Sequence, residues 1–240
     1  MRKKKHGAER IAACADLLIA DPTVLLDDPQ APFGTARPLC LEIGCGKGAF
    51  ACGTAAAQPD INLIAMERVA DVACLALERA AAERELRPGD NLRFIIGNAQ
   101  NIPEWFPEHS LDRIYLNFSD PWPKSGYAKR RLTHVGFLEM YRKALKEDGL
   151  LLFKTDNVGL FDFSLEEIEA MGLTCSKLTR DLHGSEYNEG NVMTEYETAF
   201  SEAGMKINML EVTKPLGFAP EISPELARGR KRYTSNGEDL

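Results

Sequence analysis

The chain has 240 residues, 44% of them hydrophobic, and a formal net charge of −7, which is enough apolar material for one domain with a full core. Its apolar runs are far shorter than the roughly 18 residues of a membrane span, and its basic N-terminus lacks the apolar segment of a secretory signal. The six cysteines form no C-x-x-C pair and the four histidines show no metal-ligand spacing. We therefore expect a soluble cytoplasmic protein without disulfides or a bound metal.

Five short apolar runs of strand length alternate with helix-like segments along the chain. The predicted strands are residues 38–44, 61–67, 91–97, 111–118 and 149–155, and the predicted helices are residues 47–57, 69–86, 134–147 and about 157–171. This order predicts an α/β fold in which helices cover both faces of a mostly parallel sheet.

The last third of the chain has a different pattern. Residues 173–183 and 192–203 show strand-like alternation and predict a terminal antiparallel pair. From about Glu211 the sequence turns to proline, glycine and charge without periodicity, so residues 211–240 are predicted to be a tail of uncertain order. We expect a single domain over residues 1–210 that includes a basic N-terminal arm or helix over residues 1–20.

The first predicted strand ends in "LEIGCGKGAF", which places Gly44, Gly46 and Gly48 at the start of a helix. Glycines at such a junction permit a tight turn and let a ligand approach the backbone. The G-x-G-x-G spacing departs from the G-x-G-x-x-G of dinucleotide-binding proteins. A glycine-rich turn alone is purely structural about as often as it binds a ligand.

Polar residues at the ends of neighbouring predicted strands favour a ligand at this edge. Glu67 follows Gly44 by 23 residues and could accept both hydroxyls of a ribose. Asn98 is placed to hydrogen-bond an adenine edge, although alone it is equally consistent with a simple turn. Glu42 would repel a pyrophosphate but suits a ligand with an ammonium and a sulfonium. The combination favours S-adenosylmethionine over NAD.

The fourth predicted strand leads into "NFSDPWPKSGYAKRRL", residues 117–132. Pro121 and Pro123 stiffen the backbone, so Asp120 is expected to be held in place. Trp122 is expected either to stack on a base or to fill the core. The loop continues with four cations and no acid: Lys124, Lys129, Arg130 and Arg131.

The negative net charge hides an uneven distribution. Residues 2–5, 124–131 and 228–232 hold twelve of the 29 cations and no acid, which leaves 17 cations against 36 acids elsewhere. Such patches are compatible with a localised phosphate-binding face, and solvated loops are the alternative for any single run.

Four motifs in order, "EIGCGKGAF", "NFSDPWPKSGYAKRRL", "KTDN" and "TEYE", resemble the bacterial tRNA (guanine-N7)-methyltransferase family, the TrmB type, over roughly residues 1–210. The resemblance implies a Rossmann-like class I methyltransferase fold with a seven-stranded sheet. It also implies transfer of a methyl group from S-adenosylmethionine to N7 of a guanine in the tRNA variable loop, at tRNA position 46. Whether such a protein is a monomer or a homodimer stays open.

Matched by motif, the resemblance also implies roles for individual residues. The methyl-donor site comprises Glu42, Gly44, Gly46, Gly48, Glu67, Asn98 and Asp120, with Asp120 also in the catalytic position. Contacts to the tRNA substrate come from Lys124, Asp156, Thr194, Glu195, Tyr196 and Glu197.

Chemistry assigns finer roles within this set. Guanine N7 has an in-plane lone pair and no proton, so Asp120 is expected to orient the base and offset its developing charge rather than to remove a proton. Glu197 or Asp156 could accept the guanine N–H groups. The loop cations, Lys124, Lys129, Arg130 and Arg131, are expected to hold flanking phosphates.

Three rival functions remain at this point. The chain could methylate another RNA base or a protein side chain, or it could be a non-catalytic RNA-binding subunit on a methyltransferase fold. An NAD-dependent dehydrogenase is disfavoured by the glycine spacing and by Glu42.

Overall fold

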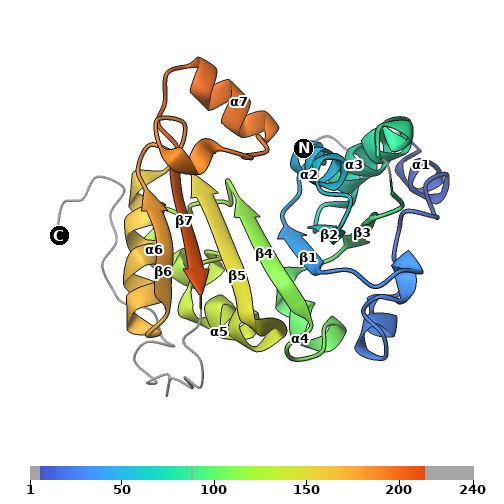
Figure 1. Cartoon of the computed structure of the whole chain (residues 1–240), viewed down its shortest axis with the longest axis horizontal. Coiled ribbons are helices and arrows are strands. Elements are labelled where there is room, and N and C mark those ends of the chain that lie inside the picture. Colours follow the sequence, from blue (N-terminus) through green and yellow to red (C-terminus); the bar gives the residue numbers. More distant parts are fainter. Residues whose placement is uncertain (1–5, 88, 214–240) are drawn as a thin grey trace.

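The computed structural model describes residues 6–87 and 89–213. In this part of the chain seven strands form one sheet in the order β3-β2-β1-β4-β5-β7-β6 (Figure 1). The strands are β1 Leu39–Ile43, β2 Asn62–Glu67, β3 Leu92–Ile96, β4 Leu111–Asn117, β5 Leu145–Thr155, β6 Thr174–Thr179 and β7 Asn208–Thr213. The helices are α1 Gly7–Ala12, α2 Ala49–Ala57, α3 Ala70–Ala82, α4 Ile102–Trp105, α5 Val135–Ala144, α6 Val158–Ala170 and α7 Glu195–Glu202.

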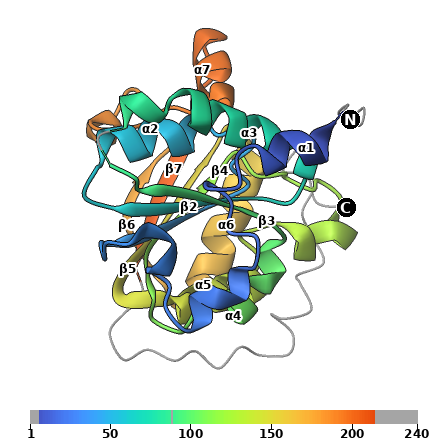
Figure 2. The ribbon, with the colours of Figure 1, turned by 90° about the vertical axis from the view of Figure 1, so that its right-hand side faces the viewer.

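The predicted mixed α/β architecture is confirmed. Strands β1 to β5 pair in parallel, and β7 pairs antiparallel with both β5 and β6. Helices α1, α2 and α3 lie on one face of the sheet and α4, α5 and α6 on the other (Figure 2). All five residues of β1 are buried, as expected for a central parallel strand whose two faces both pack against helices.

Two apolar clusters form the core, one on each face of the sheet. The larger contains Ile64, Leu116 and Phe153 with residues of α5 and α6. The smaller contains Leu63, Phe94 and Tyr115 with residues of α2 and α3. Side chains of successive strand residues point to opposite faces, so β1 to β4 each supply both clusters.

The prediction of a strand over residues 192–203 is wrong. This segment contains α7, and the antiparallel partner of β6 is β7. The helix begins after Thr194, whose hydroxyl accepts the backbone N–H of Glu197 at 2.9 Å. T-x-x-E is the sequence signature of a capped helix N-terminus, and here that local signal outweighs the alternating pattern.

The boundary predicted at about Glu211 falls inside β7, because residues 211–213 complete that strand. Residues 214–240 and 1–5, which include two of the three basic runs, lie outside the described part of the chain. Among the described residues no helix is both long and apolar enough to cross a membrane.

Candidate active site

A cavity of about 620 Å³ lies at the carboxyl ends of β1, β2, β3 and β4. Open α/β sheets bind ligands at this edge, where loops from neighbouring strands meet. The fold brings eight of the predicted site residues to its wall: Gly44, Gly46, Glu67, Asn98, Asp120, Lys129, Arg130 and Tyr196. Residues from the first and the last thirds of the chain therefore share one cavity.

The glycine loop after β1 has backbone angles that favour glycine. Gly44, Gly46 and Gly48 have φ values of 81°, 57° and 81°, in the left-handed region. The N–H of Gly44 donates to the carbonyl oxygen of Met66 at 2.8 Å, which fastens the turn to β2. A Cβ on Gly48 would lie 3.0 Å from the Cβ of Ala76, so glycine here also lets α2 and α3 pack closely.

Glu67 and Asn98 are held at the cavity wall by backbone groups. The Glu67 carboxylate accepts the N–H of Gly46 at 3.2 Å and of Val69 at 2.9 Å. The side-chain oxygen of Asn98 accepts the backbone N–H of Gln100 at 3.1 Å, and this bond orients the Asn98 side-chain amide near the end of β3. Both side chains are thus fixed before any ligand binds.

Glu42 lies beneath the glycine loop and does not line the cavity wall. Its side chain is buried, Oε1 accepts the amide of Asn117 at 3.1 Å, and Oε2 has no hydrogen-bond partner among the described residues. Burial raises the pKa of Glu42 to about 7, against the opposing effects of Asn117 and Lys154. A buried carboxylate with a spare acceptor fits a cationic ligand group. The pairing of Asn117 with Glu42, 75 positions away, was not predicted, because no local pattern connects the two residues.

The Asp-Pro-Trp-Pro turn after β4 has an unusual backbone. Phe118 and Trp122 have φ values of 52° and 43°, a region that side chains with a Cβ adopt at a cost. Arg131 holds the turn: its Nε donates to the carbonyl oxygen of Pro121 at 3.0 Å and its Nη2 to that of Trp122 at 2.9 Å. Asp120 is exposed at the cavity within this fixed turn.

The prediction that Arg131 grips a tRNA phosphate is therefore corrected. Arg131 is fully buried, and its guanidinium carbon lies 4.3 Å from the centre of the Phe163 ring. The other three loop cations, Lys124, Lys129 and Arg130, are exposed. Arg130 lies over the rings of Trp122, at 4.8 Å, and Tyr127, at 4.7 Å, so an aromatic surface holds it at the cavity.

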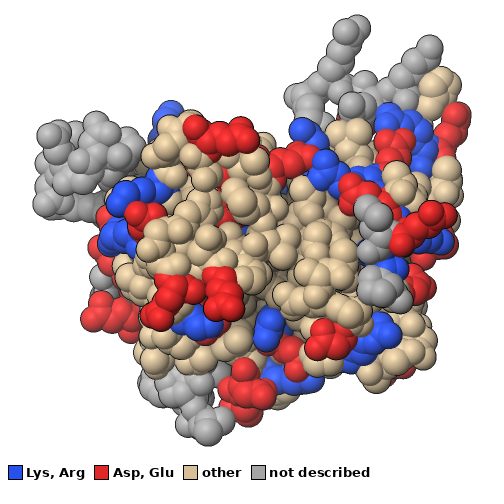
Figure 3. All heavy atoms as spheres, turned by 45° about the horizontal axis from the view of Figure 1, so that its top comes forward, with Lys and Arg blue, Asp and Glu red and all other residues tan. Residues whose placement is uncertain are grey.

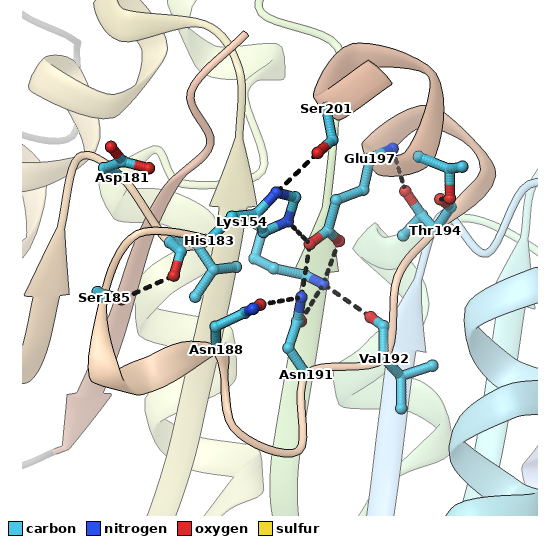
Figure 4. A network of polar contacts seen from close by, with 12 residues as sticks. Lys154, Asp181, His183, Ser185, Asn188, Asn191, Val192, Thr194, Glu197 and Ser201 are labelled. Carbon is cyan, nitrogen blue, oxygen red and sulfur yellow. Dashed lines mark hydrogen bonds and ion pairs between the residues drawn. The ribbon is translucent and has the colours of Figure 1, made fainter. Parts of the chain in front are cut away.

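The four residues of "TEYE" have four different environments. Thr194 caps α7, and Glu195 forms ion pairs with Arg79 at 2.6 Å and Lys47 at 3.3 Å. Tyr196 is 63% exposed and lines the cavity. Glu197 is fully buried in a polar network with Lys154 and others (Figure 4). The prediction that Glu197 accepts guanine N–H groups is therefore corrected, because its carboxylate is engaged inside the protein.

Two more predicted residues lie away from the cavity wall. Asp156 is partly exposed just after β5, and Lys124 precedes the short 3-10 helix Ser125–Arg130. A smaller cavity of about 230 Å³ opens over the sheet face between α2 and residues 187–192, and none of the predicted site residues lines it.

Charges of both signs surround this edge of the sheet. Figure 3, which tilts the edge toward the viewer, shows acidic and basic side chains interspersed rather than one continuous basic face. A grip on a polyanion would therefore depend on individually placed cations such as Lys129 and Arg130, and not on the net field of the protein.

Comparisons with known proteins agree with this geometry. A family model described as "Putative methyltransferase" matches residues 36–210. A curated "tRNA (guanine-N(7)-)-methyltransferase" of Lachnoclostridium phytofermentans is 45% identical over 204 residues, which are 85% of this chain and 94% of the relative. The protein of the same name from a Geobacillus species is 43% identical over 215 residues, 90% of this chain and 96% of the relative. The chain belongs to the tRNA (guanine-N7)-methyltransferase family.

Solved structures support the fold assignment for this family member. The 16S rRNA methyltransferase KamB superposes with a TM-score of 0.60 at 12% identity, covering 79% of this chain and 94% of KamB. The antibiotic-resistance methyltransferase Kmr gives 0.56 at 18% identity, covering 82% of this chain and 94% of Kmr. At such identities the likeness concerns the fold alone, which is that of class I S-adenosylmethionine-dependent methyltransferases. The family and fold predicted from the sequence are confirmed.

Proposed function

We propose that this protein transfers the methyl group of S-adenosylmethionine to N7 of a guanine in tRNA, the guanine at position 46 of the variable loop. The observation that carries the proposal is the convergence of Glu67, Asn98 and Asp120 on one cavity in a chain of this family. A tRNA substrate also supports the expected cytoplasmic location.

The residues at the cavity fit S-adenosylmethionine, which supplies a methyl group activated on a sulfonium. Glu67 is placed to accept the ribose hydroxyls and Asn98 to contact the adenine edge. Glu42 is buried just beneath this cavity, so its carboxylate would attract the donor's ammonium group through its charge, and that cation would in turn favour the ionised carboxylate. The left-handed turn at Gly44 and Gly46 leaves room for the donor to approach the backbone.

The chemical step requires alignment more than proton transfer. Guanine N7 attacks through a lone pair without losing a proton, and the purine becomes cationic as the methyl group arrives. Asp120 is exposed at the cavity in a turn that Arg131 fixes, so its carboxylate can orient the base and stabilise the developing positive charge. No general base is needed for this reaction.

Binding of the RNA is assigned to exposed residues around the cavity. The N7 edge of a paired guanine faces the deep, narrow major groove of A-form RNA, so the target must be unpaired or displaced. Lys129 and Arg130, at the cavity wall, and Lys124 are placed to contact flanking phosphates. Asp156 is the remaining candidate acceptor for the guanine N–H groups.

The experiment is incubation with methyl-labelled S-adenosylmethionine and an unmodified tRNA transcript, followed by nucleoside analysis. We expect N7-methylguanosine from the wild-type transcript and none when adenine replaces guanine 46. Another methylated nucleoside would assign the enzyme to a different RNA base. Absence of methylation together with intact tRNA binding would indicate a non-catalytic RNA-binding subunit.

A further inference from the structure

A buried lysine connects the central sheet to the helix at the cavity. Lys154 is the second-last residue of β5 and is only 6% exposed. Its Nζ donates to Asn191 Oδ1 at 2.9 Å, to the carbonyl oxygen of Val192 at 2.9 Å and to Glu197 Oε2 at 2.5 Å (Figure 4). All three acceptors belong to the segment that leads into α7 or to its first turn.

Glu197 is the centre of this network. Its Oε1 accepts the amide of Asn191 at 2.7 Å and lies 2.9 Å from Nε2 of His183 (Figure 4). Burial acts to raise the pKa of Glu197, but Lys154 and the other donors outweigh it and lower the pKa below its ordinary value. The carboxylate therefore stays ionised and paired inside the protein, and it would have to leave these donors to reach a base.

The neighbouring residues of α7 face other parts of the molecule. Glu195 pairs with Lys47 of the glycine loop and Arg79 of α3, on the donor side. Tyr196, the next residue, lines the cavity together with Asp120 and is largely exposed. Successive helical residues point about 100° apart, so fixing Glu197 on one side determines where Tyr196 points on another.

We propose that Lys154 is a positioning residue for methyl transfer, which acts through Glu197 to fix the first turn of α7 and so the place of the Tyr196 ring at the cavity. The inference rests on the proposed function, because the group to be positioned against Tyr196 is the target guanine. An exposed aromatic ring beside a methyl-donor cavity suits stacking of an unpaired base, which every base face permits.

Energetics agree with a positioning role. Burying an ion pair is costly, and well-packed apolar residues would often stabilise the fold as well or better. The ion pair instead fixes geometry. Three acceptors must surround the Lys154 ammonium at hydrogen-bond distance, so the chain between Asn191 and Glu197 has a single placement. An apolar contact would tolerate sliding of α7.

The first test replaces Lys154 by methionine, which keeps an unbranched side chain one atom shorter and removes the charge. The control is Lys177→Met, because Lys177 pairs with Glu211 at 3.1 Å across β6 and β7 rather than with a residue of α7. We expect Lys154→Met to raise the KM for tRNA about tenfold or more while the Kd for S-adenosylmethionine changes less than about threefold. An unchanged KM, or an equal loss of donor binding, would overturn the proposal.

A double-mutant cycle tests whether Lys154 acts through Tyr196. We expect Tyr196→Ala to impair tRNA methylation, and Lys154→Met to cause less than about a threefold further loss of kcat/KM in that background. Full additivity of the two substitutions would refute coupling between Lys154 and the ring. If Lys154→Met does not fold, Glu197→Gln, which preserves volume, takes its place in the cycle with the same expectation.

Hydrogen exchange separates this inference from the proposed function. In the protein without substrate, we expect the amides of residues 195–202 to exchange about tenfold faster in Lys154→Met than in the wild type, and unchanged in Lys177→Met. Unaltered exchange would show that Lys154 does not hold α7. A wild-type enzyme that makes no N7-methylguanosine would instead refute the proposed function, whatever the exchange result.

Discussion

Arg131 donates hydrogen bonds from Nη2 and Nε to the carbonyl oxygen of Trp122, at 2.9 and 3.3 Å, across nine residues of the basic loop. Arg131, which lies in the same loop as three exposed cations, thus stabilises the turn that carries Asp120. The basic loop combines two tasks, since its buried arginine shapes the turn while its exposed cations face the solvent.

Replacing the buried Arg131 by methionine should destabilise the protein by about 2–4 kcal/mol, because the carbonyl groups of Pro121 and Trp122 lose a charged donor. Urea unfolding followed by circular dichroism measures this. The adjacent Arg130→Met is the control, and its free energy of unfolding should change by about 1 kcal/mol or less, since Arg130 is exposed and loses only its contacts with the rings of Trp122 and Tyr127. Equal effects of the two substitutions would contradict the assignment.

Neutralising Lys129 and Arg130 together should weaken tRNA binding and flatten its salt dependence. Each lost phosphate contact reduces the slope of log K against log salt by about 0.7–0.9, so the double substitution to glutamine should reduce it by about 1.5. Filter binding at several salt concentrations gives the slope, and calorimetry should show unchanged affinity for S-adenosylmethionine. A parallel shift without a change of slope would argue against phosphate contacts.

Asp120→Asn should lower kcat by about 100-fold while leaving the Kd for the methyl donor within about threefold. The amide preserves the shape of the turn but cannot offset the positive charge that develops on the guanine. Single-turnover methylation of tRNA isolates this step from product release. Near-normal turnover with intact donor binding would exclude the electrostatic role.

Donor affinity should rise with pH through the range in which Glu42 ionises. Burial raises the pKa of Glu42 to about 7, so between pH 4.5 and 7 the folded protein binds more protons than the unfolded chain and this group's contribution to stability falls as pH rises. A cationic donor favours the ionised form. We therefore expect binding about fivefold tighter at pH 7 than at pH 6 by titration calorimetry.

Glu42→Gln is the control for that titration. The glutamine keeps the acceptor oxygen but has no proton to lose, so the pH dependence over this interval should disappear. A variant with the same pH dependence as the wild type would place the titrating group elsewhere, for instance on the donor's own amine.

Local patterns were sufficient to predict β1 to β5, the glycine loop and the turn at Asp120. Parallel strands buried on both faces have continuous apolar runs, and Gly44 to Gly48 mark the first strand end without any tertiary information. For the same reason Glu67, which ends β2, and Asn98, two residues after β3, could be placed at one sheet edge.

Contacts between distant segments could not be predicted in this way. The partner of Glu197 is Lys154, 43 residues earlier, and nothing in either neighbourhood indicates that both are buried. The burial of Arg131 among exposed cations likewise follows from packing against Phe163. The helix at "TEYE" is different, because its capping signature is readable in the sequence and outweighs the alternating pattern of residues 192–203.

The left-handed backbone of Trp122 offers a way to separate two possible roles of its ring, contact with a base and stiffening of the loop. Glycine would adopt this conformation at a cost lower by about 1–2 kcal/mol. Exchanging Trp122 for glycine therefore relieves the main chain while deleting the indole, whereas alanine deletes the indole and keeps the strain. The difference in the free energy of unfolding between the two variants measures the backbone strain at this position. Any loss of methylation that both variants share is due to the missing indole ring.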